Sequence, residues 1–195
     1  MSGQYTSSNP LLAVSLITLI SISYNLITKK NEQSPCPPIE GKTEAKLKEL
    51  DISIPLPPSP KGNYVSVVRS GNLLHLCGHI PTTSTGELIQ GKLGKDLTVE
   101  QGYESAKACA INILGTLSKE LGEGNLDKIR RIVKVVGFVN CTNDFTQQPS
   151  VINGASDLFG SVFGTLRGQH ARSAVGTNSL PLNIATEVEC IVELY

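Results

Sequence analysis

The sequence predicts one α+β domain in which helices cover one face of a mixed sheet. Two segments have the apolar spacing of helices, several others are rich in β-branched residues, and no internal repeat has the period of a solenoid. The expected order is strand-strand-helix-strand-helix-strand-strand. Helices that follow strands in this order must cross over one face of a single sheet.

The first half of the domain contains a strand pair and a long helix. Residues 64–81 hold two strand-like runs around the turn Ser70-Gly71-Asn72, which is typical of a β-hairpin. Thr98 and Gln101 have the spacing of a helix N-cap and capping box. The apolar residues that follow recur in steps of four and three, which predicts one buried stripe: Val99, Tyr103, Ala106, Ala110, Ile113, Leu117 and Leu121.

The second half contains a strand, a helix and a final pair of strands. Residues 128–141 are rich in β-branched side chains and predict a long buried strand. A helix is expected from residue 149 to 159 or 163. Residues 170–176 and 185–194 are predicted as two strands of one closing hairpin, joined by a turn that contains proline and asparagine.

The N-terminal part of the chain differs in composition from the rest. Residues 1–28 carry no charged side chain, and 11–27 form an almost continuous apolar run diluted by serine, threonine and asparagine. The basic segment of a secretory signal and the arginines of a mitochondrial transit peptide are both missing. Lys29 and Lys30 would hold the rest of the chain on the cytoplasmic side. We expect a weak membrane anchor and a cytoplasmic-facing domain; the alternatives are a mitochondrial location and an extension without an anchoring role.

Residues 29–51 are predicted as a linker, because prolines and charged residues dominate this stretch. Within it, residues 42–50 favour a brief helix. The folded domain is expected to span residues 52–195.

The overall charge argues against a nucleic-acid partner. Seventeen basic and seventeen acidic side chains give a formal net charge of zero, and the longest basic cluster, residues 128–134, is short and interleaved with strand residues.

Five widely spaced cysteines include no CxxC pair, which argues against a zinc ribbon or a thioredoxin-type site and suits a reducing compartment.

Other site chemistries have little support. His75, Cys77 and His79 alternate along one strand, but no second group of metal ligands accompanies them, so we expect no metal site. The chain has no G-x-S-x-G nucleophile elbow, no P-loop and no G-x-G-x-x-G fingerprint.

Two charged residues remain in the apolar C-terminal strands. Arg172 lies on the first strand of the expected hairpin and Glu187 on the second, so both could meet on adjacent strands. Arginine can hold a carboxylate by two parallel hydrogen bonds, and a nearby carboxylate can position or deprotonate a water molecule. The pair suggests a small anionic substrate and a hydrolytic step; the alternative is an edge strand with solvated charges.

Three short segments of the C-terminal part stand in a recognisable order and spacing: Arg172-Ser173-Ala174-Val175, then Leu180-Pro181, then Glu187-Val188-Glu189. This pattern resembles the signature of the Rid family of reactive intermediate (enamine/imine) deaminases, also described as endoribonuclease L-PSP-like. The segments 62–64 and 70–81, and Asn153 in the second helix, resemble further family motifs. The resemblance covers residues 52–195.

The resemblance implies a chorismate-mutase-like fold and a homotrimer with clefts between subunits. It also implies hydrolysis of 2-imino and 2-enamino acids to 2-oxo acids and ammonia, with no cofactor and no metal. Arg172 would hold the substrate carboxylate and Glu187 would orient the attacking water. The substrate pocket would be lined by Tyr64, Cys77, Gly78, Asn153 and Ala174, some of them from a neighbouring subunit.

This chain also departs from the family pattern. Ala174 stands where the best-known deaminases often have cysteine, Cys77 replaces a serine, His79 a glutamine and Asn63 a proline. These changes indicate a divergent subgroup. The alternatives to a deaminase are a paralogue that only binds small carboxylates and an L-PSP-type ribonuclease, against which the neutral charge argues.

Overall fold

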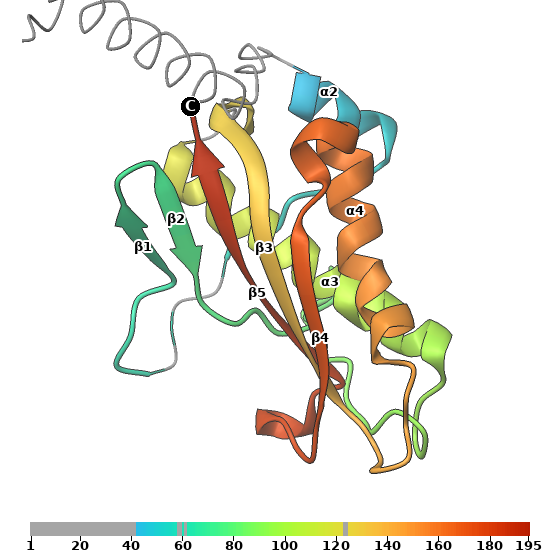
Figure 1. The fold of residues 1–195 in the computed structure, drawn as a ribbon. Helices are drawn as coiled ribbons and strands as arrows, with labels where there is room; N and C mark the ends of the chain where they lie inside the picture. The colour runs from blue at the N-terminus through green and yellow to red at the C-terminus, as the bar shows by residue number, and fades with distance from the viewer. Residues whose placement is uncertain (1–41, 58–59, 61, 123–124) are drawn as a thin grey trace, which may run out of the picture. The chain divides into compact units, whose positions relative to one another are not determined.

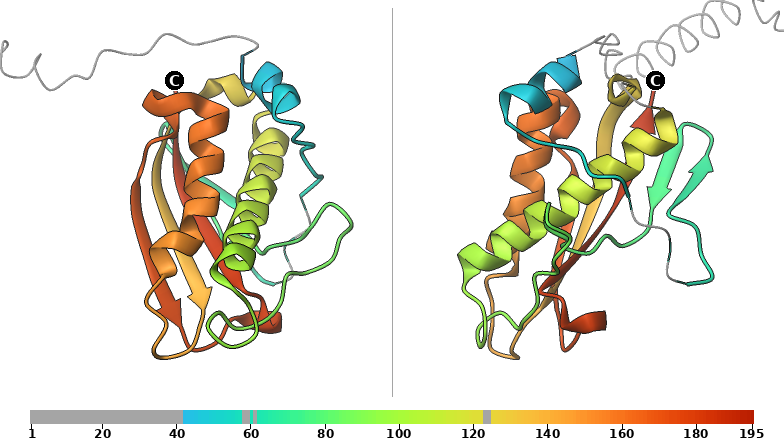
Figure 2. Two further views of the ribbon diagram at one scale, coloured as in Figure 1. Left: turned by 90° about the vertical axis from the view of Figure 1, so that its right-hand side faces the viewer. Right: turned by 180° about the vertical axis from the view of Figure 1, so that it is seen from behind.

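In the computed structural model, residues 42–57, 60, 62–122 and 125–195 are described. They form one mixed sheet whose strand order is β1-β2-β5-β3-β4, with helices α3 and α4 on one face (Figure 1, Figure 2). The predicted α+β class, with helices on one face of a mixed sheet, is confirmed. The bounds are β1 Val67–Ser70, β2 Leu73–Leu76, α3 Val99–Leu121, β3 Ile129–Asn140, α4 Gln148–Gly168, β4 Ala171–Thr177 and β5 Thr186–Leu194, with short 3-10 turns at Leu126–Lys128 and Pro181–Asn183.

Helix α3 begins as its sequence predicts. The Thr98 hydroxyl accepts a hydrogen bond from the Gln101 backbone nitrogen at 3.3 Å, and the Gln101 side chain accepts one from the Thr98 nitrogen at 2.9 Å. Ala106, Ala110 and Ile113 of the predicted stripe are completely buried. This face packs against β5 and against α4, so α3 forms the centre of the core.

Helix α4 lies against α3 at a very short distance. A Cβ atom on Gly154 would lie 2.0 Å from the carbonyl oxygen of Tyr103 on α3, so only glycine fits where the two helices touch. The helix continues to Gly168, beyond the predicted end, with a break at Gly164 (φ 74°). Asn153 and Ser156, the residues of α4 that bond Arg172, lie within the predicted part of the helix.

The predicted closing hairpin is wrong. Strand β4 pairs in parallel with β3, and β5 pairs antiparallel with both β3 and β2, so β3 lies between the two expected partners. Helix α4 supplies the crossover that a parallel pair needs. Every second residue of β5 is buried along its whole length, as suits a central strand, whereas β4 is partly exposed, as suits an edge.

The packed chain begins within the stretch predicted as linker. Residues Lys42–Glu49 form helix α2, where a brief helix was expected, and Leu47 is 5% exposed in the core. The Thr43 nitrogen donates to Asp127 Oδ1 at 3.1 Å, and the Thr43 hydroxyl bonds the same oxygen. The folded part therefore starts at least ten residues before residue 52.

The apolar run at residues 11–27 lies outside the described residues. Among the helices that the structure describes, none is long and apolar enough to cross a membrane.

Candidate functional site

The residues predicted for the site separate into two groups. Tyr64, Cys77, Gly78 and Glu187 line one cleft of about 600 Å³. The others gather around Arg172, which lines an open hollow of about 800 Å³: Asn153 bonds its guanidinium, and Ala174 lies two residues further along β4. Within one chain, the cleft and the hollow are separate.

The sheet explains this separation. Val135 of β3, which is completely buried, pairs with Arg172 on one side and with Cys190 on the other, and the Arg172 guanidinium bonds side chains of α4. Arg172 therefore lies on the helix-covered face. Glu187 precedes the completely buried Val188 and points to the opposite face. The expectation that Arg172 and Glu187 meet on adjacent strands is wrong for a single chain.

The guanidinium of Arg172 is held by neutral groups. Its Nη1 atom donates to Asn153 Oδ1 at 2.8 Å and to Ser156 Oγ at 3.0 Å, which uses both hydrogens of that nitrogen. No carboxylate among the described residues lies within 4.0 Å of it, in contrast to Arg130, Arg131 and Arg167. Nε and Nη2 have no hydrogen-bond partner in the described part of the chain. These two nitrogens can bind a planar carboxylate.

The carboxylate of Glu187 rests on the backbone of Gly78. A Cβ atom on Gly78 would lie 1.9 Å from Glu187 Oε1, so glycine is needed to leave space for the carboxylate. Burial raises the pKa of Glu187, and the nearby Glu189 raises it further. This carboxylate therefore accepts a proton more readily than an ordinary surface glutamate.

His79 fixes the segment that carries Gly78. Its Nδ1 lies 2.8 Å from the Cys77 carbonyl oxygen, its Nε2 lies 2.8 Å from Thr116 Oγ1, and its backbone nitrogen donates to Val188 O at 2.8 Å. Burial lowers the pKa of His79, which favours the neutral ring. The hydrogen bonds of His79 therefore hold the backbone of residues 77–79, which lines the cleft, in place.

Cys77 is a poor nucleophile in this setting. Burial raises the pKa of its thiol, and the negative charge of Glu187 raises it further. A thiolate attack would need the opposite effect. Cys77 thus contributes shape to the cleft.

The alternating residues His75, Cys77 and His79 do not converge. His75 is exposed on β2, whereas the His79 ring faces Thr116. Over the described ranges, no group of three or more His, Cys, Asp or Glu side chains is arranged to hold a metal ion.

Three functional candidates were missed from the sequence. Ser156 and His170 lie beside Arg172, and Leu182, in the left-handed backbone region (φ 56°), lines the Glu187 cleft. Ser156 follows Asn153 by three residues on one helix, so helical spacing was a usable signal. No comparable signal marks Leu182, because its place depends on the long connection between β4 and β5.

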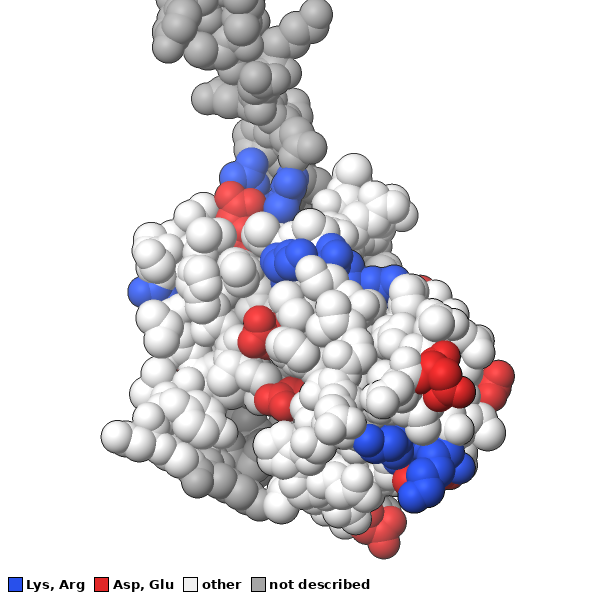
Figure 3. All heavy atoms as spheres, turned by 60° about the horizontal axis from the view of Figure 1, so that its bottom comes forward, with Lys and Arg blue, Asp and Glu red and all other residues white. Residues whose placement is uncertain are grey.

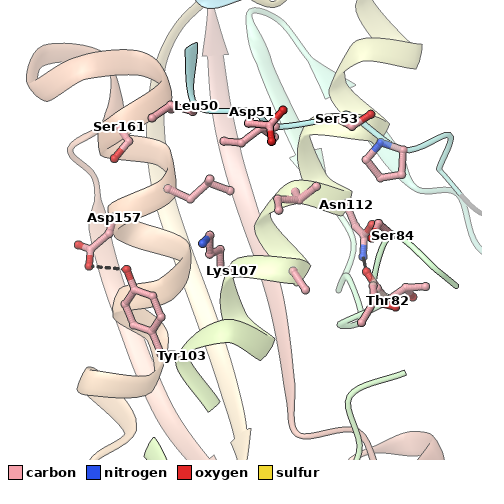
Figure 4. A pocket seen from close by; sticks show the side chains of 16 residues that line it. Leu50, Asp51, Ser53, Thr82, Ser84, Tyr103, Lys107, Asn112, Asp157 and Ser161 are labelled. Atoms are coloured by element: carbon pink, nitrogen blue, oxygen red, sulfur yellow. Dashed lines mark hydrogen bonds between the residues drawn. The ribbon is translucent and has the colours of Figure 1, made fainter. Parts of the chain in front are cut away.

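A third hollow, of about 760 Å³, lies between α3, α4 and residues 50–55 (Figure 4). The Tyr103 hydroxyl donates to Asp157 Oδ2 at 3.1 Å at one end of it, and Lys107 and Asn112 also line it. It contains none of the residues predicted for the site.

The basic cluster of residues 128–134 is largely paired. Arg130 and Arg131 lie 3.0 Å and 3.6 Å from the carboxylate oxygens of Glu193, and Lys134 donates to Ser173 Oγ at 2.8 Å. Figure 3 shows small groups of both charges separated by uncharged surface on the face in view. That face carries no extended basic track for a phosphate backbone.

Comparison with known proteins agrees with this fold. Residues 44–195 match the family model described as "YjgF/chorismate mutase-like, putative endoribonuclease". The chain is 45% identical over 154 residues to protein TCP17 of Trypanosoma cruzi, covering 79% of this chain and 95% of that protein. It is 32% identical over 142 residues to a 2-iminobutanoate/2-iminopropanoate deaminase of Dermatophagoides farinae, covering 72% and 93%.

A solved structure is similar over most of the fold. The crystal structure of Atu1372 from Agrobacterium tumefaciens, a protein of unknown function, has a TM-score of 0.72 and 42% identity, covering 78% of this chain and 92% of that one. The family match extends over most of the chain and agrees with the open mixed sheet and its two covering helices. The chain therefore belongs to the Rid family, the YjgF/chorismate-mutase-like proteins.

Proposed function

We propose that the protein hydrolyses reactive 2-imino and 2-enamino acids to 2-oxo acids and ammonia without a cofactor. The observation that carries the proposal is the guanidinium of Arg172, which is held by neutral side chains and keeps Nε and Nη2 without partners among the described residues. Such a group suits the carboxylate common to these substrates. The similarity to a protein named as an imine deaminase supports the same chemistry.

The proposed reaction needs one proton acceptor. A water oxygen attacks C2 of the protonated imine, and Glu187 takes the proton that the water loses. Glu187 then returns the proton to the nitrogen of the resulting carbinolamine, and the C2–N bond breaks as the C2 hydroxyl becomes the 2-oxo group. The proton lost by that hydroxyl leaves with the ammonia, so the products are a 2-oxo acid and ammonium. The raised pKa of Glu187 suits both transfers.

We further propose that the site is completed by two chains. Arg172 and Glu187 lie on opposite faces of the sheet, so a substrate that touches both requires Arg172 from one subunit and Glu187 from another. The face without helices carries partly exposed apolar residues such as Val136, Phe138 and Val175, which another copy would cover. A homotrimer is the assembly that we propose.

The direct test is hydrolysis of 2-aminoacrylate generated by a dehydratase, with pyruvate and ammonia release measured for the full chain. We expect a rate above the uncatalysed one, and a loss of about a hundredfold or more in kcat/KM for Arg172→Ala, because the charged group that would hold the substrate carboxylate is removed. Arg69→Ala is the matched control, since Arg69 is exposed and, among the described residues, its side chain donates only to Gly71 O at 3.0 Å. An uncatalysed rate for the wild type, or an unchanged rate for Arg172→Ala, would contradict the proposal.

A second candidate is a paralogue that binds small carboxylates without turnover. The feature that favours it is Ala174, which lies two residues from Arg172 on the same strand and packs against the core. Alanine supplies no reacting group there. Arg172-dependent binding of pyruvate without imine hydrolysis would favour this candidate.

A further inference from the structure

A short chain of hydrogen bonds connects Arg172 to the core. Ser156 Oγ, which accepts from Arg172 Nη1, also lies 3.0 Å from His170 Nε2. The other ring nitrogen, His170 Nδ1, lies 2.6 Å from the carbonyl oxygen of Gly168. Three residues thus connect the end of α4 to the guanidinium on β4.

The direction of each hydrogen bond follows from the groups involved. A carbonyl oxygen only accepts, so His170 Nδ1 must carry a hydrogen. Burial lowers the pKa of His170 and the charge of Arg172 lowers it too, which together outweigh the opposing effect of the hydrogen bond to Gly168. The ring is therefore neutral at pH 7 and Nε2 is an acceptor. The Ser156 hydroxyl therefore donates to Nε2 and presents its lone pairs to Arg172.

The imidazole itself is held in place. The imidazole and the Phe159 ring are nearly perpendicular, with a centroid distance of 6.1 Å and an interplanar angle of 86°, and Phe159 is completely buried. Packing against the core thus fixes the orientation of His170, and its hydrogen bond to Ser156 fixes the direction of the Ser156 hydroxyl. Besides Arg172, the charged residue type lining the Arg172 hollow is Asp157, whose carboxylate accepts a hydrogen bond from the Tyr103 hydroxyl. Figure 4 shows this bond in the neighbouring third hollow, which Asp157 also lines.

We propose that His170 and Ser156 are positioning residues of the anion site and act through Arg172, a role that rests on the proposed function. Together with Asn153 they hold Nη1 with neutral acceptors only, which fixes the guanidinium plane and leaves its positive charge for the ligand. With the plane fixed, Nε and Nη2 can donate two parallel hydrogen bonds to a carboxylate in one orientation.

The test measures binding and turnover in the same full-length variants. Ser156→Ala and His170→Leu should each weaken pyruvate binding in calorimetry, and raise the KM for 2-aminoacrylate, by about 3- to 10-fold, because each removes one hydrogen bond that positions the guanidinium. The kcat value should change little, because a carboxylate contact is made equally in substrate and transition state. Because the two residues act in series, the double variant should be no worse than Ser156→Ala.

Two variants separate positioning from a general structural effect. His170→Gln keeps an acceptor for the Ser156 hydroxyl and should stay within about twofold of the wild type. Ser161→Ala is the matched control, since Ser161 lines the same hollow on α4 without a hydrogen bond to Arg172.

The outcomes for the positioning role and for the deaminase are distinguishable. Binding by the wild type that is unchanged in Ser156→Ala and His170→Leu, or additive losses in the double variant, would overturn the positioning role. Pyruvate binding with the expected pattern, but no imine hydrolysis, would support positioning and contradict the deaminase. If the wild type neither binds pyruvate nor hydrolyses 2-aminoacrylate, both proposals are overturned.

Discussion

Arg172 and Glu187 are placed in surroundings that affect their charges differently. No carboxylate among the described residues lies within 4.0 Å of the Arg172 guanidinium, so its positive charge is not paired there. Its Nη1 atom is bound by an amide oxygen and a hydroxyl oxygen instead. Glu187 sits half-buried on Gly78 beside Glu189, which opposes its ionisation. Arg172 is therefore suited to binding an anionic ligand, and Glu187 is suited to accepting and returning a proton.

At the residue scale, Glu187→Gln should stabilise the protein at neutral pH. The folded-state pKa of Glu187 is raised above its ordinary 4.5, so the folded state is increasingly disfavoured as the pH rises above 4.5, and the full disadvantage is present above the raised pKa. Below 4.5 the carboxyl is protonated in both states and the disadvantage disappears. The gain in Tm should therefore be present at pH 7 and vanish as the pH falls through 4.5.

Thermal unfolding of both proteins from pH 4 to pH 8 measures this difference. A gain that persists at the acid end, or a lower Tm for Glu187→Gln at pH 7, would show that the carboxylate is not disfavoured in the folded state.

At the scale of elements, local signals predicted more than pairings. The capping box of Thr98 and Gln101 and the apolar stripe of α3 are local, and both are present in the structure. The positions of β4 and β5 along the chain were predicted correctly, but their pairing with each other was wrong, since both pair with β3. Alternation of buried and exposed residues identifies a strand but does not identify the strand beside it. The wrong pairing then placed Arg172 and Glu187 on one surface.

Helix α2 escaped full prediction for a related reason. Its surroundings in the sequence are rich in proline and charge, and a single buried leucine, Leu47, joins it to the core. Asp127, which accepts from Thr43, is 84 residues away in the sequence. Short-range patterns contain no information on such a contact.

At the same scale, Leu47→Ala should destabilise the domain by about 2–5 kcal/mol, because a buried leucine is replaced by a cavity. Leu56→Ala is the control: Leu56 is 90% exposed, and its loss should change stability by less than about 0.5 kcal/mol. Urea unfolding of both variants measures the two values. Equal stability of Leu47→Ala and the wild type would mean that α2 is not part of the cooperative fold.

At the scale of the whole molecule, the apolar residues 11–27 are expected to attach the protein to a membrane. This prediction concerns residues outside the described part of the chain. Deletion of residues 1–28 should move the protein from the membrane fraction to the supernatant when cells are fractionated. A full-length chain that is already in the supernatant, or a deletion that stays with the membranes, would contradict the anchor.

The assembly proposed for catalysis also belongs to this scale. The separation of Arg172 from Glu187 within one chain implies that neither the cleft nor the hollow suffices for hydrolysis. In a cyclic trimer, each site would take Arg172 from one subunit and Glu187 from the next.

Mixing two inactive variants tests this account most directly. Arg172→Ala and Glu187→Gln are co-expressed with different tags, and 2-aminoacrylate hydrolysis is measured on the purified mixture. Random cyclic trimers should recover about one quarter of the wild-type activity, because three of four trimers are mixed and each mixed trimer contains one intact site in three. No recovery in verified mixed trimers would contradict a site shared between subunits.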